Sequence, residues 1–428
     1  MNTRLAILTF FLFLVFPACG VLEVGFEEPP SRPTASPSPS LTLLPTVTIP
    51  PTDFDPLQPG QKIRLISIRM LDKMTGWGVG QIEGQPTDYL LVTSDGGRTW
   101  RNRTPRMAHQ NPPPQGLSAT AFFGPGGLAW AIFTDRAPEA YPPSGQVVWR
   151  TTDYGQTWQA SAELSLQGLP TQHFIPDHLR FLDDRTGWLM AHLGAGMSHD
   201  YIAIFLTNDG GQTWRRVVDP ERTPTLMSCP KTGLAFSDLQ NGWLMGDCPG
   251  LMPGLFLYST ANGGEDWNPV NLPVPVGQPA DLFGGEKAGC GVPGLAYLGA
   301  DAVMFSVRCS SYNGGRPSAW LYAAKAGEAF SARVLPQPYG NLQFLNLQEG
   351  WFIGAASSDP TTPGEIYHTT DGGLTWRLVL ATGWQGTPHF IDSSIGWVIA
   401  QSGEELALVY TVNGGAMWEE INAMIGKD

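Results

Sequence analysis

An octet of the form Thr-x-Asp-x-Gly-x-Thr-Trp recurs along the chain and constrains its fold more than any other feature. Four copies are complete, and two carry Asn in place of Asp. The Asp or Asn positions are Asp95, Asp153, Asp209, Asn262, Asp371 and Asn413. Such a side chain accepts hydrogen bonds from backbone amides in a tight turn, and Gly permits positive φ there. Each octet therefore predicts a turn that closes a β-hairpin. Equivalent copies cannot each be a catalytic centre, so we expect these Asp and Asn residues to be structural.

A second signature, a turn with Gly-Trp and then an apolar run, precedes most octets. Its Trp residues are Trp77, Trp188, Trp243, Trp351 and Trp397, with Trp130 in a variant Leu-Ala-Trp form. The two signatures together divide each unit into four short strands; in one unit we expect them at 178–182, 188–192, 201–207 and 213–218. A unit within 295–335 lacks the octet. Counting it, residues 63–423 hold seven units, and repeats of this kind predict an all-β fold, a seven-bladed β-propeller with four-stranded antiparallel blades.

Charge and hydropathy exclude two other classes of protein. The 428-residue chain has 25 Lys and Arg against 38 Asp and Glu, a formal net charge of −13. This acidity argues against a nucleic-acid partner, because neutralising phosphates needs a basic face. The mean hydropathy of −0.10 argues against a protein with many membrane spans.

The first sixty residues are typical of an exported, tethered protein. Residues 1–18 form a signal peptide, with Arg4 before a short apolar run. The segment ends in Phe16-Pro17-Ala18-Cys19, which resembles the lipobox of bacterial lipoproteins, in which the Cys is lipidated. Residues 19–60 are a linker rich in Pro, Ser and Thr that cannot bury a core. We expect an extracytoplasmic domain anchored to the membrane through Cys19; the alternative is an ordinary signal peptide with an incidental Cys, and a secreted protein.

Four further cysteines have a repeated spacing. Cys229 and Cys248 are 19 residues apart, and so are Cys290 and Cys309. In both units the first Cys precedes strand one and the second ends strand two, so each pair is expected to meet across the open end of a hairpin. We predict disulfides Cys229–Cys248 and Cys290–Cys309, in keeping with an oxidising compartment. Metal binding is the alternative, but no CxxC or paired His accompanies these cysteines, so no metal is expected.

The octets resemble the Asp-boxes of BNR-repeat propellers. With the Gly-Trp turns and one propeller, the chain resembles the photosystem II stability/assembly factor family. That resemblance implies a non-enzymatic scaffold outside the cytoplasm that engages a protein partner, a membrane protein or complex. Asp-boxes also occur in sialidases, two-propeller xyloglucanases and sortilin-type receptors. A glycan-binding or degenerate glycoside-hydrolase propeller therefore stays open as the alternative.

No pattern of catalytic residues stands out. A sialidase needs an Arg triad for the substrate carboxylate, but Arg64 and Arg69 lack the Arg-Ile-Pro context of its first member. The carboxylate pairs at 183–184, 404–405 and 419–420 are typical of turns or exposed strands. We therefore expect no catalytic residue, no cofactor and no enzymatic activity.

Long connections on one face of the propeller are the expected recognition surface. The turn between strands one and two and the octet turn should share one face, and long connections such as 101–116 and 193–200 should lie opposite. Candidate binding residues there are Arg101, Arg103, Arg106, His109, Arg215, Arg216, Arg222, Tyr141, Tyr201, Tyr312 and Trp384. The basic ones would dock an acidic segment, or are solvated surface charges; the aromatic ones would contact a partner, or pack. Both terminal units look complete, so ring closure should come from 63–70 packing beside 389–393.

Overall fold

The computed structural model describes residues 57–106, 116–137, 145–170, 172–197, 199–247, 254–284, 288–311 and 314–427. The chain divides into two units, Met1–Thr46 and Val47–Asp428. The first lies outside the described residues, as do the linker up to residue 56 and the predicted lipidation site Cys19. Signal peptide, anchor and linker therefore stay predictions.

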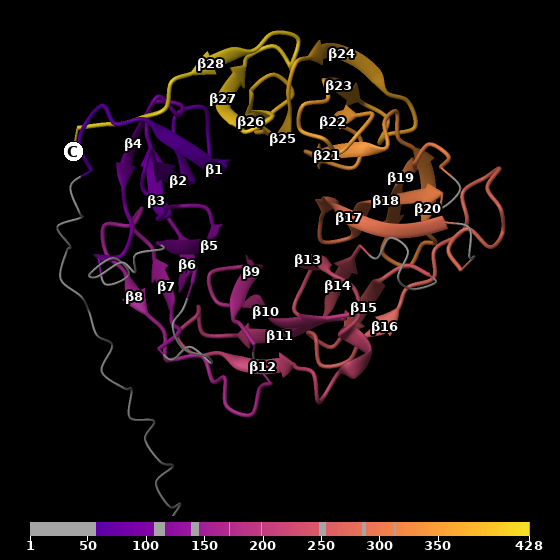
Figure 1. Ribbon diagram of the computed structural model, residues 1–428, viewed down its shortest axis with the longest axis horizontal. Helices are drawn as coiled ribbons and strands as arrows, with labels where there is room; N and C mark the ends of the chain where they lie inside the picture. Colours follow the sequence, from indigo (N-terminus) through magenta and orange to yellow (C-terminus); the bar gives the residue numbers. More distant parts are fainter. Residues whose placement is uncertain are drawn as a thin grey trace, which may run out of the picture. The chain divides into compact units, whose positions relative to one another are not determined.

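Within the second unit, the described strands form seven sheets, six of four strands and one of five, which are the blades of a ring (Figure 1). This confirms the predicted all-β seven-bladed propeller. The first three blades are β1 (Ile63–Met70), β2 (Gly76–Ile82), β3 (Tyr89–Thr93) and β4 (Thr99–Asn102); β5 (Leu117–Phe123), β6 (Ala129–Asp135), β7 (Val148–Thr151) and β8 (Gln159–Ala160); and β9 (Ile175–Phe181), β10 (Gly187–Gly196), β11 (His199–Thr207) and β12 (Arg215–Val218).

The remaining four blades follow in chain order. Blade four is β13 (Lys231–Phe236), β14 (Asn241–Gly246), β15 (Leu257–Ala261) and β16 (Asn268–Pro269), preceded by a 3₁₀ turn, η2 (Pro224–Leu226). Blade five is β17 (Ala288–Leu298), β18 (Ala302–Ser311), β19 (Ser318–Lys325) and β20 (Ser331–Val334). Blade six is β21 (Tyr339–Phe344), β22 (Gly350–Ala355), β23 (Gly364–Thr369) and β24 (Arg377–Thr382). Blade seven is β25 (Gln385–Phe390), β26 (Gly396–Ser402), β27 (Glu405–Thr411) and β28 (Glu419–Ile421).

The two ends of each blade differ as expected. The octet turn touches the turn between strands one and two: Gly96 N donates to Met74 O at 2.8 Å, and Gly210 N donates to Arg185 O at 2.7 Å. We call the face with these turns the short-turn face and the opposite one the long-loop face. Two expected loops are in part strands. Arg101 and Asn102 belong to β4, and residues 193–200 largely extend β10 and β11. Antiparallel pairing continues there because it satisfies backbone groups that an open loop would leave to solvent.

Within an octet, the side chains hold the turn as the sequence predicted. Thr99 donates to the Asp95 carboxylate from its amide at 2.8 Å and from its hydroxyl at 2.6 Å. The Thr93 hydroxyl accepts from Gly97 N at 3.0 Å. Burial works to raise the pKa of Asp95, but these hydrogen bonds outweigh it, and the pKa is lowered. The carboxylate is thus a saturated acceptor inside a turn.

A contact between neighbouring blades, which we call the Trp–octet contact, joins the two signatures. Trp188 of β10 stacks on Phe236 of the next blade with ring centroids 3.7 Å apart, and its Nε1 donates to Gly263 O, in the next octet, at 3.1 Å. The same bond to the next octet is made by Trp130, Trp351 and Trp397. These four Trp residues are almost fully buried between blades because each is covered by its neighbour's turn.

The ring closes differently from the sequence expectation. After β28, the chain continues into β29 (Met424–Ile425), which pairs in parallel with β4 of blade one. Gly60 N donates to Ile425 O at 2.8 Å, and Ile425 N donates to Gln61 O at 2.9 Å. The expected contact between β1 and β25 is also present, as Met70 N donates to His389 Nε2 at 2.9 Å. Packing of the inner strands is thus only part of the closure, and a strand at the outer edge completes it.

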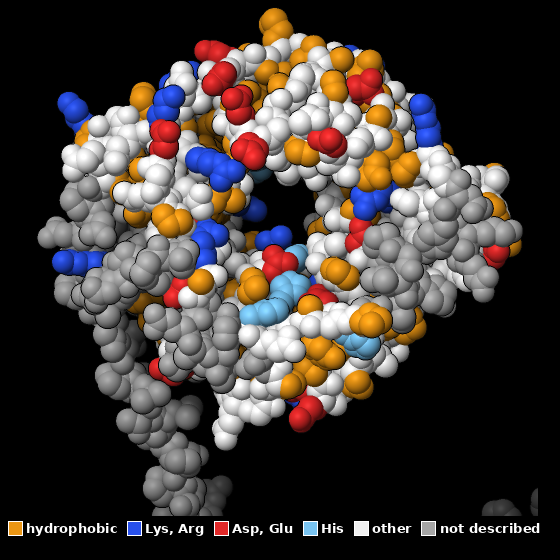
Figure 2. Space-filling view, viewed as in Figure 1, with side chains coloured by type: hydrophobic (Ala, Val, Ile, Leu, Met, Phe, Trp, Pro, Cys, Tyr) orange, Lys and Arg blue, Asp and Glu red, His pale blue; other side chains and the backbone are white. Residues whose placement is uncertain are grey.

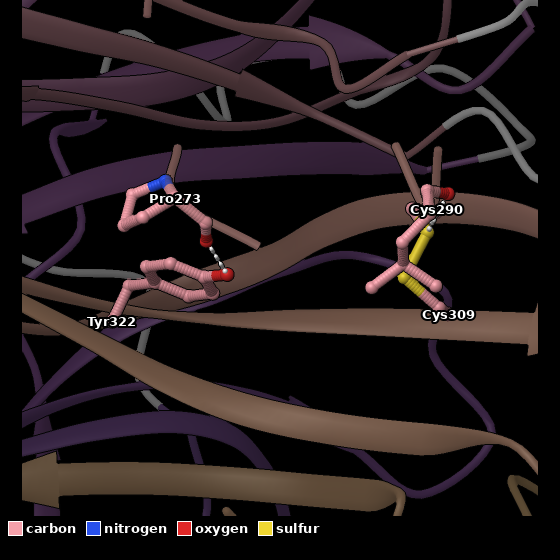
Figure 3. The surroundings of a disulfide bond; sticks show 5 residues. Pro273, Cys290, Cys309 and Tyr322 are labelled. Carbon is pink, nitrogen blue, oxygen red and sulfur yellow. Dashed lines mark hydrogen bonds between the residues drawn. A yellow bond between two sulfur atoms is a disulfide. The ribbon is translucent and has the colours of Figure 1, made fainter. Parts of the chain in front are cut away.

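One of the two predicted disulfides lies within the described residues. Cys290 and Cys309 are bonded and stand opposite each other in the register of β17 and β18 (Figure 3). Cys290 lies inside β17 rather than before it, because that strand begins seven residues earlier than the expected start at Leu295. Nearby, the Tyr322 hydroxyl donates to Pro273 O at 2.7 Å. Cys229 is buried, but Cys248 lies outside the described residues, so Cys229–Cys248 stays a prediction.

Candidate functional site at the channel rim

The central channel is lined by the first strand of each blade and holds two cavities. The one toward the long-loop face has a volume of about 750 Å³ and is lined by residues such as Arg64, Asp88 and Arg136. The other, of about 690 Å³, includes Arg69 and Arg180 in its wall. Both share Ser67, Ile68, Pro388 and His389. Figure 2 shows histidine, acidic and basic side chains gathered around the opening.

Five charged or titratable residues of blades three and four form what we call the His192 network: Asp177, His178, His192, Asp200 and Lys231. His192 of β10 lies between two carboxylates, with Nδ1 2.8 Å from Asp200 Oδ1 and Nε2 3.3 Å from Asp177 Oδ2. His178 Nδ1 lies 2.7 Å from the same Asp177 oxygen. Lys231 of the next blade lies with its Nζ 3.6 Å from Asp200 Oδ2, and its side chain is fully buried.

Lys231 is held by more than this one ion pair. Its ammonium group donates to Ser228 O and Cys229 O, each at 2.8 Å, and lies 4.7 Å from the centre of the Phe256 ring. Its backbone amide donates to Asp200 at 3.0 Å. A buried ammonium group needs all these partners to offset the loss of water. Lys231 therefore joins blade four to blade three.

The pKa shifts in the network follow from burial and pairing. Burial works to lower the pKa of His192, but the two carboxylates outweigh it and raise this pKa to about 9. Burial works to raise the pKa of Asp177 and of Asp200, but hydrogen bonds and nearby positive charge lower both. Burial lowers the pKa of Lys231 to about 8, against the pull of Asp200. Near neutral pH the network therefore holds an imidazolium, an ammonium and two carboxylates.

Two more carboxylates at this end of the ring are bound in the same way. Asp88 accepts from Arg136 at 2.6 Å and from Ala119 N at 2.9 Å, both in the next blade. Asp247 accepts from Arg308, likewise in the next blade, at 2.6 Å. Acidic side chains of blades one, three and four thus each bind a cation of the following blade.

The predicted basic residues lie at the outer edge of the ring rather than around the channel. Arg101 is on β4 and Arg215 and Arg216 are on β12, the fourth strands of blades one and three, so blade two separates them. Arg215 and Arg222 are paired with Glu265, and Arg216 with Asp219 at 3.1 Å. The structure therefore does not bring the two groups together, because the fourth strands of different blades lie toward the outside of the ring, where the blades are far apart.

The other predicted contacts divide into packed residues and residues outside the described part. Tyr201 packs between blades three and four and stacks on His199 at 5.8 Å. Trp384 packs edge-on against Trp418 at 5.7 Å. Arg106 is exposed, and the carbonyl of Arg103 accepts from Trp158 Nε1 at 2.7 Å. His109, Tyr141 and Tyr312 lie outside the described residues.

Sequence reasoning missed the His192 network. Its members come from four strands, β9, β10, β11 and β13, and have no motif-like spacing. The available signal was a Lys at the start of a strand that is otherwise apolar, since a charge in such a place needs a partner.

The described residues hold neither a candidate metal centre nor a candidate membrane-spanning helix. They include no group of three or more His, Cys, Asp or Glu placed to hold a metal ion. Over the same part of the chain, no helix has both the length and the apolar character needed to cross a membrane.

No family model matches the chain. A 74-residue stretch, 17% of the chain, is 39% identical to the photosystem II assembly lipoprotein Ycf48 of Synechococcus sp., of which it covers 20%. A 262-residue stretch, 55% of the chain, is 23% identical to the xyloglucanase Xgh74A of Acetivibrio thermocellus, of which it covers 29%. The chain thus spans less than a third of the length of these curated relatives. Among solved structures, YCF48 from Cyanidioschyzon merolae is 20% identical with a TM-score of 0.47, over 85% of this chain and 98% of that one.

Proposed function

We propose that the protein is a non-catalytic scaffold outside the cytoplasm that binds a protein partner, a membrane protein or complex, through its long-loop face. The observation that carries this proposal is the pairing of the carboxylates at the channel rim. Asp88, Asp177, Asp200 and Asp247 each bind at least one Arg, His or Lys side chain. These four carboxylates offer charge and shape for recognition, and none of the four is an unpaired acid or base.

The titration of the rim residues argues against glycoside hydrolysis at this site. A hydrolase needs a carboxylic acid with a raised pKa beside a second carboxylate. Here the pKa of Asp177 and that of Asp200 are lowered, so neither holds a proton near neutral pH. His192, with its pKa raised to about 9, stays protonated and cannot accept a proton as a general base.

Exposed apolar side chains beside the network supply a contact surface. Met197, at the turn between β10 and β11, is 91% exposed, and Ile175, at the start of β9, is 52% exposed. Both belong to the long-loop end of blade three, which also holds the His192 network. Apolar residues beside a charged rim are typical of a protein-binding surface.

Two further observations support the class of partner and the compartment. The relative with 39% identity over 74 residues is named as a photosystem II assembly lipoprotein, which favours a role in the assembly of a membrane complex. The Cys290–Cys309 disulfide favours an oxidising compartment. In this proposal Cys19 carries the lipid anchor and residues 19–60 are the tether.

The test is affinity purification of the tagged full-length protein from detergent-solubilised host membranes, with mass spectrometry. We expect one membrane protein to be captured, and to be lost when Ile175 and Met197 are both changed to Glu. The matched control is Leu374→Glu with Met417→Glu, two apolar residues of octet turns on the short-turn face, each 70% exposed. Retention of the partner by the first variant and its loss from the control would contradict the assignment to the long-loop face.

A separate variant tests the predicted basic patch. Arg101→Glu with Arg106→Glu changes charge at the outer edge of blade one. Loss of the partner from this variant would indicate that the docking surface lies at the outer edge of blade one rather than at the channel rim.

The similarity to a xyloglucanase supports glycan binding as the second candidate function. Binding of the wild-type protein to xyloglucan oligosaccharides on a glycan array, without a captured protein partner, would favour it. Hydrolysis of those oligosaccharides would show that the protein is an enzyme.

A further inference from the structure

The channel cavity nearer the short-turn face carries a layer of side chains that neither the octets nor the rim explain. Arg69, Arg180, Gln343 and His389 line this cavity of about 690 Å³. Each is the next-to-last residue of the first strand of its blade, in β1, β9, β21 and β25. Equivalent positions in a propeller lie at equal height, so these four form one level of the channel wall.

The two guanidinium groups at this level have no acidic partner. The residues that line the cavity include no Asp and no Glu. Over the described part of the chain, neither Arg69 nor Arg180 has a carboxylate oxygen within 4.0 Å. Arg69 lies over the Phe122 ring at 5.9 Å, and Arg180 donates to the carbonyl of Leu179 at 3.2 Å. Most of their donors have no hydrogen-bond partner within the described part of the chain.

The two cations are close enough to repel each other. Burial lowers the pKa of Arg180, Asp177 raises it, and the charge of Arg69 lowers it again. Asp177 is itself occupied by His178 and His192. Arginine stays protonated in proteins, so this level of the channel keeps an excess of positive charge inside a protein of net charge −13.

His389 and Gln343 add no acceptor that could balance this charge. The amide of Met70 points at His389 Nε2 at 2.9 Å, while Met70 O lies 3.1 Å from the same atom. Because an amide hydrogen can only be donated, Nε2 accepts it and the ring proton sits on Nδ1. Gln343 uses both ends of its side-chain amide on the backbone of Phe390, at 2.6 and 2.9 Å. The free polar groups of Arg69, Arg180 and His389 are therefore all donors.

We propose that this level of the channel is a binding site for a small oxyanion, a phosphate, a sulfate or a compact polycarboxylate. A guanidinium group can bind two oxygens of such an anion at once, and a cavity lined by charge of one sign attracts an ion of the opposite sign. The cavity volume of about 690 Å³ is in the range of small-molecule sites. The site is separate from the rim proposed above for protein binding and does not depend on it.

Isothermal titration calorimetry and thermal unfolding of the full chain test this site. The probes are sodium phosphate, sodium sulfate and sodium citrate, each compared with sodium chloride at equal ionic strength. We expect saturable heat and a rise in Tm with at least one of the three, because a ligand bound only to the folded state stabilises it. Phosphate or sulfate as the tighter ligand indicates a phosphate-like anion, and citrate indicates a carboxylate. A response no larger than that to chloride would overturn the proposal.

Matched variants locate the binding. Arg69→Gln with Arg180→Gln should weaken the anion at least tenfold, whereas Arg64→Gln, at the other end of β1, should bind as the wild type does. Because the double variant removes like charges, its Tm in chloride should not fall. If it does fall, Arg69→Lys with Arg180→Lys keeps the charge but loses the paired geometry, and should still weaken binding. Wild-type affinity in both double variants would refute the site.

Discussion

His192 illustrates how one residue acquires its properties from three strands. The imidazole is on β10, one of its carboxylates on β9 and the other on β11, and only their antiparallel pairing brings the three together. Its side chain is 19% exposed, so the ion pairs are shielded from water. Because the folded-state pKa of about 9 lies above the 6.5 that is usual for histidine, protonation of His192 stabilises the folded protein.

We expect His192→Gln to lower the free energy of unfolding by about 2 kcal/mol below pH 6.5. The loss should shrink as the pH rises toward 9 and vanish above it, because the wild-type imidazolium then loses its proton. Urea unfolding of both proteins at pH 6 and pH 9.5 measures this difference. The exposed His199 provides the control His199→Gln. An equal loss from His192→Gln at both pH values would contradict a role for the charge.

At the scale of elements, the Trp–octet contact explains why two signatures recur together. Blade five carries Val303 in place of the strand-two Trp, and the next octet accepts instead from Arg333, at Gly372 O. Trp77 faces the octet of the next blade, blade two, which has Tyr154 where the other octets have Gly; the φ of Tyr154 is 59°. Here Trp77 stacks on Tyr154 at 6.2 Å, and its buried Nε1 has no hydrogen-bond partner among the residues that the structure describes. Whether the Trp–octet contact forms therefore depends on the residues of both neighbouring blades.

Replacing Trp by Phe should therefore have different costs in different blades. Trp188→Phe keeps an aromatic ring against Phe236 but leaves Gly263 O without its donor, so we expect a loss of about 1–2 kcal/mol in unfolding free energy. Trp243→Phe should lose less, because the next blade, five, has no octet and Trp243 is only partly buried. Thermal and urea unfolding of the two variants give the comparison. A larger loss for Trp243→Phe would disprove the proposed energetic role of the contact.

The hairpins of blades four and five should be closed by equivalent disulfides. Lys231 pairs with Gly246, and if this register continued by two residues, position 229 would lie opposite 248, as Cys290 lies opposite Cys309. Peptide mapping without reduction should find both bonds. Cys309→Ser should lower the unfolding free energy by about 3 kcal/mol on the chain-entropy model. A 248–290 link or free thiols would refute the pairing.

At the scale of the whole molecule, the ring depends on the segment after the last blade. β29 and the residue before it add backbone hydrogen bonds on both sides, with Met424 N donating to Arg98 O at 3.2 Å and Ile63 N donating to Ala423 O at 3.1 Å. Ile421, Ala423 and Ile425 are buried in the core shared by blades one and seven. Seven sheets in a ring have an open seam between the first and the last, and this segment covers it.

Ending the chain at Ile421 should therefore cost about 3 kcal/mol or more in unfolding free energy, because it removes several hydrogen bonds and two buried side chains. A chain that ends at Gly426 keeps β29 and should behave as the wild type does. Urea unfolding followed by Trp fluorescence measures both. Equal stability of the two truncated proteins would show that the inner strands close the ring by themselves.

The sequence by itself determined the repeat, the blade count, the octet turns and the spacing of the cysteines. These rest on contacts within a few residues, such as Thr99 with Asp95, which local sequence specifies. Only the tertiary structure brings together the His192 network, places Arg69 and Arg180 at one level of the channel, and pairs the closing strand β29 with blade one. In these, the partners come from different strands or different blades, and their meeting depends on strand register and on the curvature of the ring. The basic residues at 101–106 and 215–222 do not form one surface, for the same reason. Similar positions in a repeat are equivalent by symmetry but need not be neighbours.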